Sequence, residues 1–349
     1  MNIHEKYIKR CIELAKNGLG TTYPNPMVGS VIVLNDTIIG EGWHKKAGES
    51  HAEVIAIKSV KDQSLLKQAT IYVSLEPCSH YGKTPPCANL IVEKEIKKVV
   101  IGIVDTNSKV SGKGVRHLIE NGCNVIVGVL ENECFDLNKR FFTFHNKKRP
   151  FIILKWAETK DGFMDKTRNK TDENSPNWIS NQYAQQIVHK MRADEQAILV
   201  GTNTALNDNP SLTVRSWGGE NPVRIVIDRK SKIPTAYNLL NGMTKTIVFS
   251  EVKHNIDSYG NVIFEKLDFS ENVPKQICKV LHKYEIQSVI VEGGAQTLQS
   301  FIDVNLWDEA LVFVGDVIFK EGLKAPKLKK TPSEIRKISN DVLKIYKNN

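Results

Sequence analysis

A histidine and two cysteines in the first half of the chain form a ligand set suited to zinc: His51, Cys78 and Cys87. Three protein ligands around a tetrahedral ion leave the fourth position open to water, which is the arrangement of a catalytic site rather than a structural one. Glu53 follows the histidine by two residues and is not needed as a ligand. We expect Glu53 to take a proton from water at the open position and to hand it to a leaving amine.

Taken singly, these residues are weak signals, because His-x-Glu arises by chance and cysteines near a proline can be buried thiols. The flanking sequence strengthens the zinc interpretation. An apolar helical run, 54–57, follows Glu53; a strand-like run, 69–75, leads to Cys78; Cys87 opens another apolar run. All three ligands are thus predicted at or near helix starts, where free amides and the helix dipole favour thiolates. H-x-E followed by P-C and a further cysteine is also the general signature of zinc nucleobase deaminases.

Length and charge indicate a globular protein of more than one domain. At 349 residues the chain exceeds a typical single domain, so two domains are expected. The formal charge of +9 is modest for this size, and the lysines are scattered. The basic run at 147–149 is interpreted as a solvated linker rather than as a nucleic-acid contact.

Cysteine usage and hydropathy exclude several classes of protein. Six cysteines without a regular spacing argue against a secreted disulfide scaffold. The chain opens on an amphipathic helical pattern rather than on a signal peptide, and no apolar run is long enough to span a bilayer. We therefore expect a cytoplasmic protein with no membrane partner. The cysteines expected to be ordinary reduced thiols are Cys11, Cys123, Cys134 and Cys278.

Strands and helices alternate through the first half, which predicts an α/β layered sandwich around a five-stranded mixed sheet. Asn25 lies between two prolines in a rigid turn, where its amide either contacts a ligand or bonds its own backbone. His44 either contacts substrate or is a plain surface histidine. The predicted strands are 30–33, 37–42, 69–75, 98–105 and 125–129, and the predicted helices include 5–16, 114–121 and one that ends at 142.

The second half, after a boundary at 146–150, has the same alternating character. Ser180 is placed either as the N-cap of a helix over 182–192 or as a substrate contact. Two strand-to-helix turns, 201–204 and 293–296, carry small residues and could bind phosphates. No G-x-G-x-x-G follows the first strand, so the domain is not an ordinary Rossmann unit. Further strands are predicted at 151–157, 196–201, 223–228, 246–250, 288–291 and 310–314, and a further helix at 275–284.

The first half closely resembles the deaminase domain of the bifunctional deaminase/reductase family of riboflavin biosynthesis. The resemblance is carried by T-Y-P-N-P-M-V-G at 22–29, H-A-E at 51–53 and above all P-C-S-H-Y-G-K-T-P-P-C at 77–87. It implies zinc ligands His51, Cys78 and Cys87, with Glu53 as proton shuttle. The family's D-P-N-P is D-T-N-S at 105–108 in this chain. The implied substrate contacts are Asn25, His44, Lys83, Thr84 and Asn107; Lys83 would offer a point charge to a ribose phosphate.

The second half resembles the reductase domain of the same family, which is similar in fold to dihydrofolate reductase and uses NADPH. The matching segments are L-K-W-A at 154–157, L-V-G at 199–201, D-N-P-S-L-T-V-R at 208–215 and V-E-G-G at 291–294. Two stretches depart from the pattern: T-K-D-G at 159–162, where the family has S-L-D-G, and 315–325. The resemblance implies a substrate site lined by Lys155, Ser180, Arg192, Asp208, Arg215 and Glu292. It implies NADPH contacts from Trp178, Thr202, Thr204, Gly293 and Gly294.

The resemblance therefore implies a cytidine-deaminase-like α/β/α sandwich over 1–146 and a dihydrofolate-reductase-like α/β domain over 150–349. The expected enzyme deaminates a diaminopyrimidinone ribosylamine phosphate with zinc and then reduces the ribosyl group with NADPH. We expect a small-molecule substrate, no nucleic-acid partner and self-association. Two rival hypotheses are a nucleic-acid or free-nucleoside deaminase and a degenerate zinc-stabilised scaffold. The eight-residue spacing between the two cysteines and the D-N-P…R loop disfavour the first, and Glu53 disfavours the second.

Overall fold

The computed structural model describes residues 2–79, 85–105, 111–167, 177–252 and 258–348. The chain forms two compact units, Met1–Lys148 and Arg149–Asn349. In the part of the chain that is described, no helix is long and apolar enough to cross a membrane.

The first unit is built on a five-stranded mixed sheet, as the sequence predicts, with strand order β2-β1-β3-β4-β5. β1 runs antiparallel to β2 and β3, whereas β3, β4 and β5 are parallel. The β1–β2 hairpin closes at Asn35 and Asp36, both with positive φ, which asparagine and aspartate tolerate well. The strands are β1 (Gly29–Leu34), β2 (Thr37–Trp43), β3 (Thr70–Leu75), β4 (Lys98–Ile103) and β5 (Asn124–Val127).

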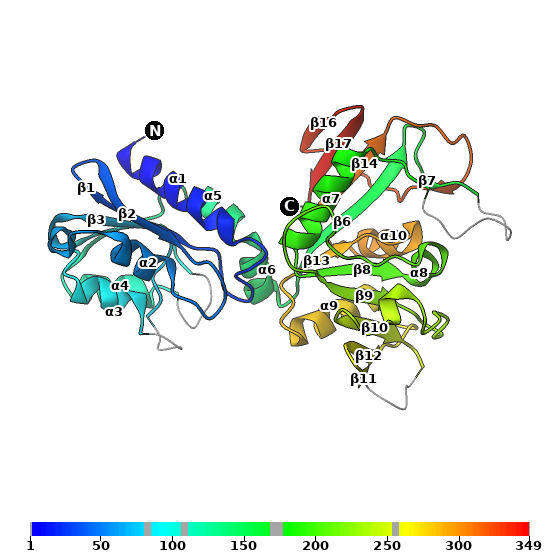
Figure 1. The fold of residues 1–349 in the computed structure, drawn as a ribbon, viewed down its shortest axis with the longest axis horizontal. Coiled ribbons are helices and arrows are strands. Elements are labelled where there is room, and N and C mark those ends of the chain that lie inside the picture. The colour runs from blue at the N-terminus through cyan, green and yellow to red at the C-terminus, as the bar shows by residue number, and fades with distance from the viewer. Residues whose placement is uncertain (1, 80–84, 106–110, 168–176, 253–257, 349) are drawn as a thin grey trace. The chain divides into compact units, whose positions relative to one another are not determined.

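Helices cover both faces of this sheet (Figure 1). One core cluster joins α1 and α5 to the sheet, and a second cluster joins α2, α3 and α4 to the opposite face. This arrangement is the predicted sandwich. The helices are α1 (Ile3–Ala15), α2 (Ala52–Ser59), α3 (Cys87–Glu93), α4 (Lys113–Glu120), α5 (Glu131–Leu137) and α6 (Lys139–Lys147), with short 3-10 turns η1 (Lys16–Gly18) and η2 (Gln63–Gln68).

Near the end of the first unit one expectation is wrong and another holds only in part. The single helix predicted to end at 142 is two helices that meet at Asn138, because the Asn138 side chain turns inward to bond both the N–H and the carbonyl of Met27, at 2.8 and 2.9 Å. In the basic run predicted to be a solvated linker, Lys147 and Lys148 are exposed and the two units divide after Lys148, but α6 continues to Lys147. Arg149 is not solvated: its guanidinium pairs with Asp308 at 2.6 Å and only 13% of the side chain is exposed.

The second unit is built on a ten-stranded sheet with order β11-β12-β10-β9-β8-β13-β6-β14-β17-β16. The seven strands from β12 to β14 in this order are parallel, and antiparallel strands flank them. A small sheet pairs β7 with β15. The strands are β6 (Phe151–Thr159), β7 (Phe163–Asp165), β8 (Ala197–Gly201), β9 (Val223–Ile227), β10 (Thr246–Ser250), β11 (Ser258–Tyr259), β12 (Val262–Lys266), β13 (Ser288–Val291), β14 (Glu309–Gly315), β15 (Leu323–Lys324), β16 (Glu334–Ile338) and β17 (Asp341–Lys347).

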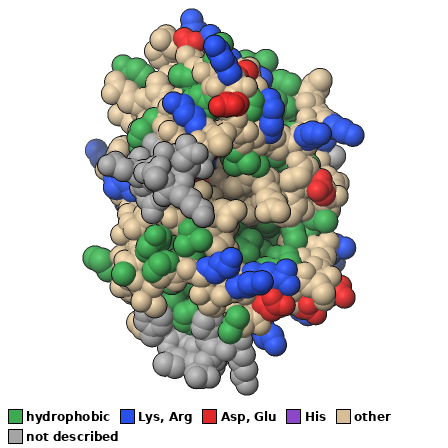
Figure 2. Space-filling model, turned by 90° about the vertical axis from the view of Figure 1, so that its right-hand side faces the viewer, with side chains coloured by type: hydrophobic (Ala, Val, Ile, Leu, Met, Phe, Trp, Pro, Cys, Tyr) green, Lys and Arg blue, Asp and Glu red, His purple; other side chains and the backbone are tan. Residues whose placement is uncertain are grey.

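Helices again cover both faces of this sheet. α9 and α10 pack on one face, whereas α8 and α7 pack against separate clusters on the other. Parallel strands end at a common edge, so the segments that follow β6, β8 and β13 meet there. Figure 2 looks toward this edge and shows a hollowed surface with dispersed Lys and Arg. The helices are α7 (Gln182–Asp194), α8 (Thr202–Asp208), α9 (Val273–Lys283) and α10 (Ala295–Asp303), with a 3-10 turn η3 (Asn238–Leu240).

Candidate active sites

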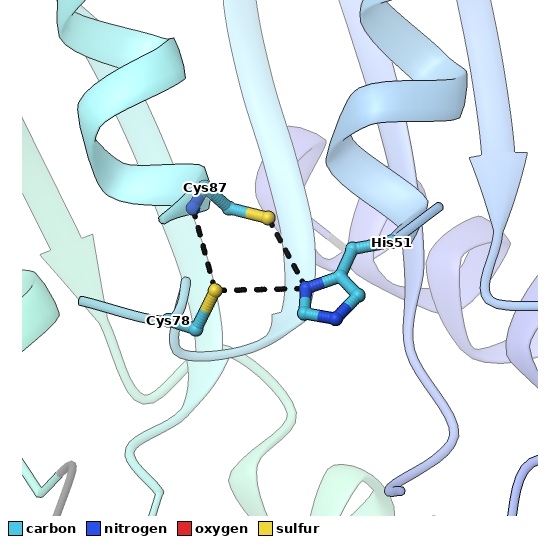
Figure 3. Close-up of side chains that lie close together, drawn as sticks. All are labelled: His51, Cys78 and Cys87. Carbon is cyan, nitrogen blue, oxygen red and sulfur yellow. Dashed lines mark hydrogen bonds between the residues drawn. The ribbon is translucent and has the colours of Figure 1, made fainter. Parts of the chain in front are cut away.

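The three predicted zinc ligands converge in the first unit (Figure 3). His51 is the N-cap of α2 and Cys87 is the first residue of α3, whereas Cys78 lies in the loop after β3. The Nδ1 atom of His51 is 3.5 Å from the Cys78 sulfur and 3.3 Å from the Cys87 sulfur. All three ligand atoms lie within 4.8 Å of one another. Cys78 is near a helix start, as expected, although it is not part of that helix. The backbone N–H of Cys87, the first residue of α3, donates to the Cys78 sulfur at 3.3 Å.

These distances fit a zinc ion. Nitrogen and sulfur ligands at about 2.0 and 2.3 Å from a tetrahedral centre lie roughly 3.5 Å apart. The ionisation of the ligands agrees with this fit. Hydrogen bonding from Cys87, opposed by burial and aided by His51, lowers the pKa of the Cys78 thiol. The pKa of Cys87 is raised by its hydrogen bond to Cys78 and by burial. Cys78 therefore favours the thiolate form without a metal. A bound dication would also favour the thiolate form of Cys87.

Glu53 is buried beside the ligands, with 3% of its surface exposed. Burial raises the pKa of Glu53 to about 7; the Cys78 charge adds to the rise and His51 opposes it. A dication bound at the ligands would shift this balance toward the carboxylate. A carboxyl group that changes protonation near neutral pH can both accept and release a proton, which is what a shuttle requires.

The structure brings Asn25 and His44 to the same site. The rings of His44 and His51 meet edge to face at 5.4 Å between centroids. His44 Nδ1 donates to the Ser50 carbonyl at 3.2 Å, which leaves Nε2 to accept from the Asn25 amide at 3.0 Å. Burial lowers the pKa of His44, so the ring stays neutral in this role. His44 is buried rather than a surface residue. The predicted contacts Lys83, Thr84 and Asn107 lie outside the described residues.

One residue of the first unit was missed at the level of sequence. Glu76 is buried two positions before Cys78, and its carboxylate accepts backbone N–H groups from residues after β4 and at the start of α4. The distances are 2.8–3.2 Å, and the donors are Asp105, Gly112, Gly114 and Val115. A glutamate between an apolar strand and a ligand is the only signal that could have marked it.

In the second unit, three of the predicted substrate residues form a largely buried charge cluster: Lys155, Arg192 and Glu292, which follows β13. Arg192 of α7 donates to Glu292 at 3.1 Å and Lys155 of β6 lies 3.5 Å from it. Burial alone would raise the pKa of Glu292, but Arg192 and Lys155 hold it at about 2. Burial lowers the pKa of Lys155 against the pull of Glu292. Arg192 Nε is buried and has no hydrogen-bond partner among the described residues, which leaves one donor for a ligand.

Arg215 joins this cluster through Thr213. Arg192 Nη1 donates to the Thr213 carbonyl at 3.3 Å, and Arg215 Nη1 contacts the Thr213 hydroxyl at 3.4 Å. The backbone N–H of Arg215 donates to Nδ1 of His189 at 3.0 Å. His189 is buried on α7 and was not singled out in the sequence; its spacing of three residues from Arg192 is the signal that could have found it.

The two glycine-containing turns lie side by side, because β8 pairs with β13. A Cβ on Gly293 would lie 2.5 Å from Val200 Cα, so only glycine permits this approach. Gly294 has φ +46°, and a Cβ there would face the Thr204 hydroxyl at 3.6 Å. The first-turn amides at the start of α10 are of the kind that bind a dinucleotide phosphate. The Thr202 hydroxyl donates to the Ile227 carbonyl at 2.6 Å, which ties the neighbouring turn to β9.

The remaining predicted residues flank this edge without forming one cluster. Trp178 is 63% exposed, Ser180 is half-buried before α7, and Asp208 ends α8. The alternative that Ser180 caps α7 is wrong. Asn181 is the N-cap, because its side chain accepts the N–H groups of Tyr183 and Ala184 at 3.0 Å.

The fold and these sites define a zinc deaminase of the cytidine-deaminase type joined to an α/β reductase. The family described as "Cytidine and deoxycytidylate deaminase zinc-binding region" matches residues 1–103, and "RibD C-terminal domain" matches residues 150–343. The chain belongs to the RibD family of riboflavin-biosynthesis proteins. It is accordingly a bifunctional deaminase/reductase that uses zinc and NADPH.

Relatives match over most of their length. The chain is 39% identical to riboflavin biosynthesis protein RibD of Aquifex aeolicus, over 92% of this chain and 89% of that one. It is 32% identical to the RibD protein of Escherichia coli, over 89% and 87%. A solved structure from Thermotoga maritima, a diaminohydroxyphosphoribosylaminopyrimidine deaminase/5-amino-6-(5-phosphoribosylamino)uracil reductase, is 38% identical with a TM-score of 0.88, over 99% and 98%. Acinetobacter baumannii RibD is 31% identical with a TM-score of 0.86, over 98% of each chain. The α/β fold class is confirmed in both halves.

Proposed function

We propose that residues 1–146 deaminate a diaminopyrimidinone ribosylamine 5′-phosphate and that residues 150–349 reduce the ribosyl group of the product to ribityl. This substrate is the one that the relative from Thermotoga maritima is described as using. The observation that carries the proposal is the pairing of a His-Cys-Cys site beside buried Glu53 with a second site of buried charge around Glu292.

In the deaminase site, His51, Cys78 and Cys87 hold the zinc ion. Zinc supplies the Lewis acidity that makes water a nucleophile near neutral pH. Glu53 takes the proton of the attacking water and delivers it to the departing ammonia, from a position buried beside the ligands. Asn25 and His44, which bond each other next to His51, orient the pyrimidine. Lys83, Thr84 and Asn107 complete the substrate contacts in this proposal.

In the reductase site, Arg192 and Arg215 bind the substrate phosphate, for which guanidinium groups are well shaped. NADPH would supply the hydride that reduces C1 of the ribosyl group in its open imine form. The residues that would hold the cofactor are Gly293, Gly294, Thr202, Thr204 and Trp178. Glu292, which follows β13, pairs with Lys155 and Arg192 and offsets one of their two positive charges. Ser180 and Asp208 contribute further substrate contacts, and Lys155 or Asp208 assists proton transfer.

One incubation tests both halves. The enzyme is given the diaminopyrimidinone ribosylamine phosphate with and without NADPH, and the products are weighed by mass spectrometry. We expect ammonia release without cofactor and a gain of two hydrogens only with NADPH. Deamination without reduction would contradict the assignment of the second domain. No turnover with zinc present would contradict the substrate.

The same proposal covers partners and location: a phosphorylated pyrimidine as substrate, no nucleic acid, self-association and a cytoplasmic setting. The dispersed Lys and Arg on the face of Figure 2 support a small-molecule site over a nucleic-acid surface. RNA binding that weakens steeply with salt would favour a nucleic-acid deaminase instead.

A further inference from the structure

The segment that carries Arg215 is tied to α7 at two points. His189 and Arg192, three residues apart, lie on one face of that helix. Arg192 Nη1 donates to the Thr213 carbonyl at 3.3 Å, and His189 Nδ1 accepts from the Arg215 backbone N–H at 3.0 Å. Helix α7 therefore fixes the backbone on both sides of Val214.

The bond to Arg215 also fixes the state of His189. A ring nitrogen that accepts a hydrogen bond carries no proton, so the proton of the neutral ring is on Nε2. The protonated ring could not accept this bond. Burial, aided by the charges of Arg192 and Arg215, lowers the pKa of His189, so the ring is neutral near pH 7.

The two hydrogen bonds from α7 hold the backbone that carries the guanidinium of Arg215, and this guanidinium has free donors. Among the described residues, no carboxylate lies within salt-bridge distance of Arg215, and its Nη1 contacts the Thr213 hydroxyl at 3.4 Å. Arg192 contributes a buried Nε–H that has no partner in the same part of the structure. Both guanidinium groups thus reach the same residue, Thr213, and both retain donors that a phosphate could accept from.

We propose that His189 is a positioning residue of the reductase: through Nδ1 it holds Arg215 where that side chain, together with Arg192, binds the substrate phosphate, and His189 itself does not touch the substrate. This inference rests on the proposed function of the second unit. It adds a residue and a specific atom whose loss weakens recognition of the phosphate while leaving the hydride step intact.

Asparagine and glutamine separate this role from mere packing. The Oδ1 of Asn lies close to where Nδ1 of histidine lies, whereas the longer Gln carries its polar atoms near the Nε2 position. We therefore compare His189→Asn with His189→Gln, and add His189→Leu as the variant without an acceptor. The reductase is assayed with the deaminated phosphorylated substrate and, separately, with the same compound lacking the phosphate.

The expected result is a split between KM and kcat. Losing one hydrogen bond is worth a factor of about 2 to 10, so the Gln and Leu variants should raise KM for the phosphorylated substrate about fivefold with kcat changed less than about twofold. The Asn variant should keep the wild-type KM for the phosphorylated substrate. None of the three changes should alter KM or kcat for the substrate without phosphate, and deamination by the first unit should be unchanged.

A double mutant with Arg215→Ala separates the proposed role of His189 from a general loss of folding. In an Arg215→Ala enzyme the His189→Gln change should add no further rise in KM, because the side chain that His189 positions is gone. Equal KM in the Asn and Gln variants, or an equal loss on the substrate without phosphate, would overturn the proposal. If wild-type enzyme does not reduce the deaminated substrate at all, the proposed function itself is wrong, which is a different outcome.

Discussion

The two sites of this enzyme use opposite means to place their charged groups. In the deaminase site a soft ligand set is gathered at the starts of α2 and α3, and one buried carboxyl, Glu53, lies beside it. In the reductase site a buried carboxylate, Glu292, is surrounded by cations from β6 and α7. The first arrangement is completed by a metal ion, whereas in the second a carboxylate of the protein itself offsets one of the two positive charges. A substitution of the buried carboxyl in the first site should therefore lower activity alone. A substitution of the carboxylate in the second site should lower both activity and the free energy of unfolding.

The largest effect is expected at Glu53. Glu53→Gln keeps the size of the side chain and removes its proton-carrying role, so deamination should fall by about 10² to 10⁴-fold. Reduction of the deaminated substrate should stay at the wild-type rate, because that site is in the other unit. Both rates are measured on the same preparation, together with zinc content by atomic absorption.

The zinc content is the control for this variant. Glu53 is not a ligand in this proposal, so the Gln enzyme should hold as much zinc as the wild type. Intact deamination would refute the shuttle role. Loss of zinc together with activity would show that Glu53 supports the metal rather than the proton transfer.

Glu292 should show the other behaviour. Glu292→Gln removes the carboxylate that the largely buried Arg192 and Lys155 share, so the second unit should lose about 3–5 kcal/mol of unfolding free energy, and reduction should fail with it. Urea unfolding monitored by tryptophan fluorescence measures the loss. Deamination in the absence of urea should persist.

The pH dependence of stability is a second test of the charge cluster around Glu292. The folded pKa of Glu292 is held at about 2, below its ordinary value of 4.5, so its ionisation stabilises the folded state fully above about pH 4.5. That contribution is lost as the pH falls from about 4.5 through 2. The stability gap between wild type and Glu292→Gln should therefore narrow over this range; a gap that stays constant there would contradict the role of charge.

The sequence could predict these sites unequally, for physical reasons. Cysteine and histidine are uncommon, and a spacing such as that of His51, Cys78 and Cys87 has few interpretations, so the ligand set was predictable from residue types alone. Lysine, arginine and glutamate are common surface residues, and Lys155, Arg192 and Glu292 are far apart in the chain. Only the family resemblance suggested their shared site, and the structure shows the three together.

The misses have a common cause as well. Glu76 and His189 act by accepting backbone N–H groups of distant segments, and Asn138 ends a helix by bonding Met27. Such tertiary hydrogen bonds leave no periodic pattern. The C-terminal strand β16 was missed for another reason. It is largely exposed at the sheet edge, so its apolar alternation is weak.

The smallest effect concerns two departures from the family pattern, which the structure brings together. Lys160 forms an ion pair with Asp316, and its N–H donates to the Val317 carbonyl at 2.9 Å. Asp161 accepts the N–H groups of Phe319 and Lys320 at 3.2 and 2.8 Å. The backbone of the stretch that begins at Gly315 is thus held by the N–H of Lys160 and by the side-chain carboxylate of Asp161, and the ion pair is a half-exposed addition.

A double-mutant cycle of Lys160→Ala and Asp316→Ala should therefore give a coupling free energy below about 1 kcal/mol, measured by urea unfolding in low salt, and less still in high salt. The affinity for NADPH, measured by fluorescence titration, should change by less than about threefold in either variant, because the bonds from the Lys160 N–H and the Asp161 carboxylate remain. Under that outcome Lys160 and Asp316 affect only the surface of the second unit, and NADPH binding does not depend on their ion pair. A tenfold loss of NADPH affinity in Lys160→Ala would instead place the ion pair among the features on which the reductase site depends, and would make that site more specific to this chain than the deaminase site is.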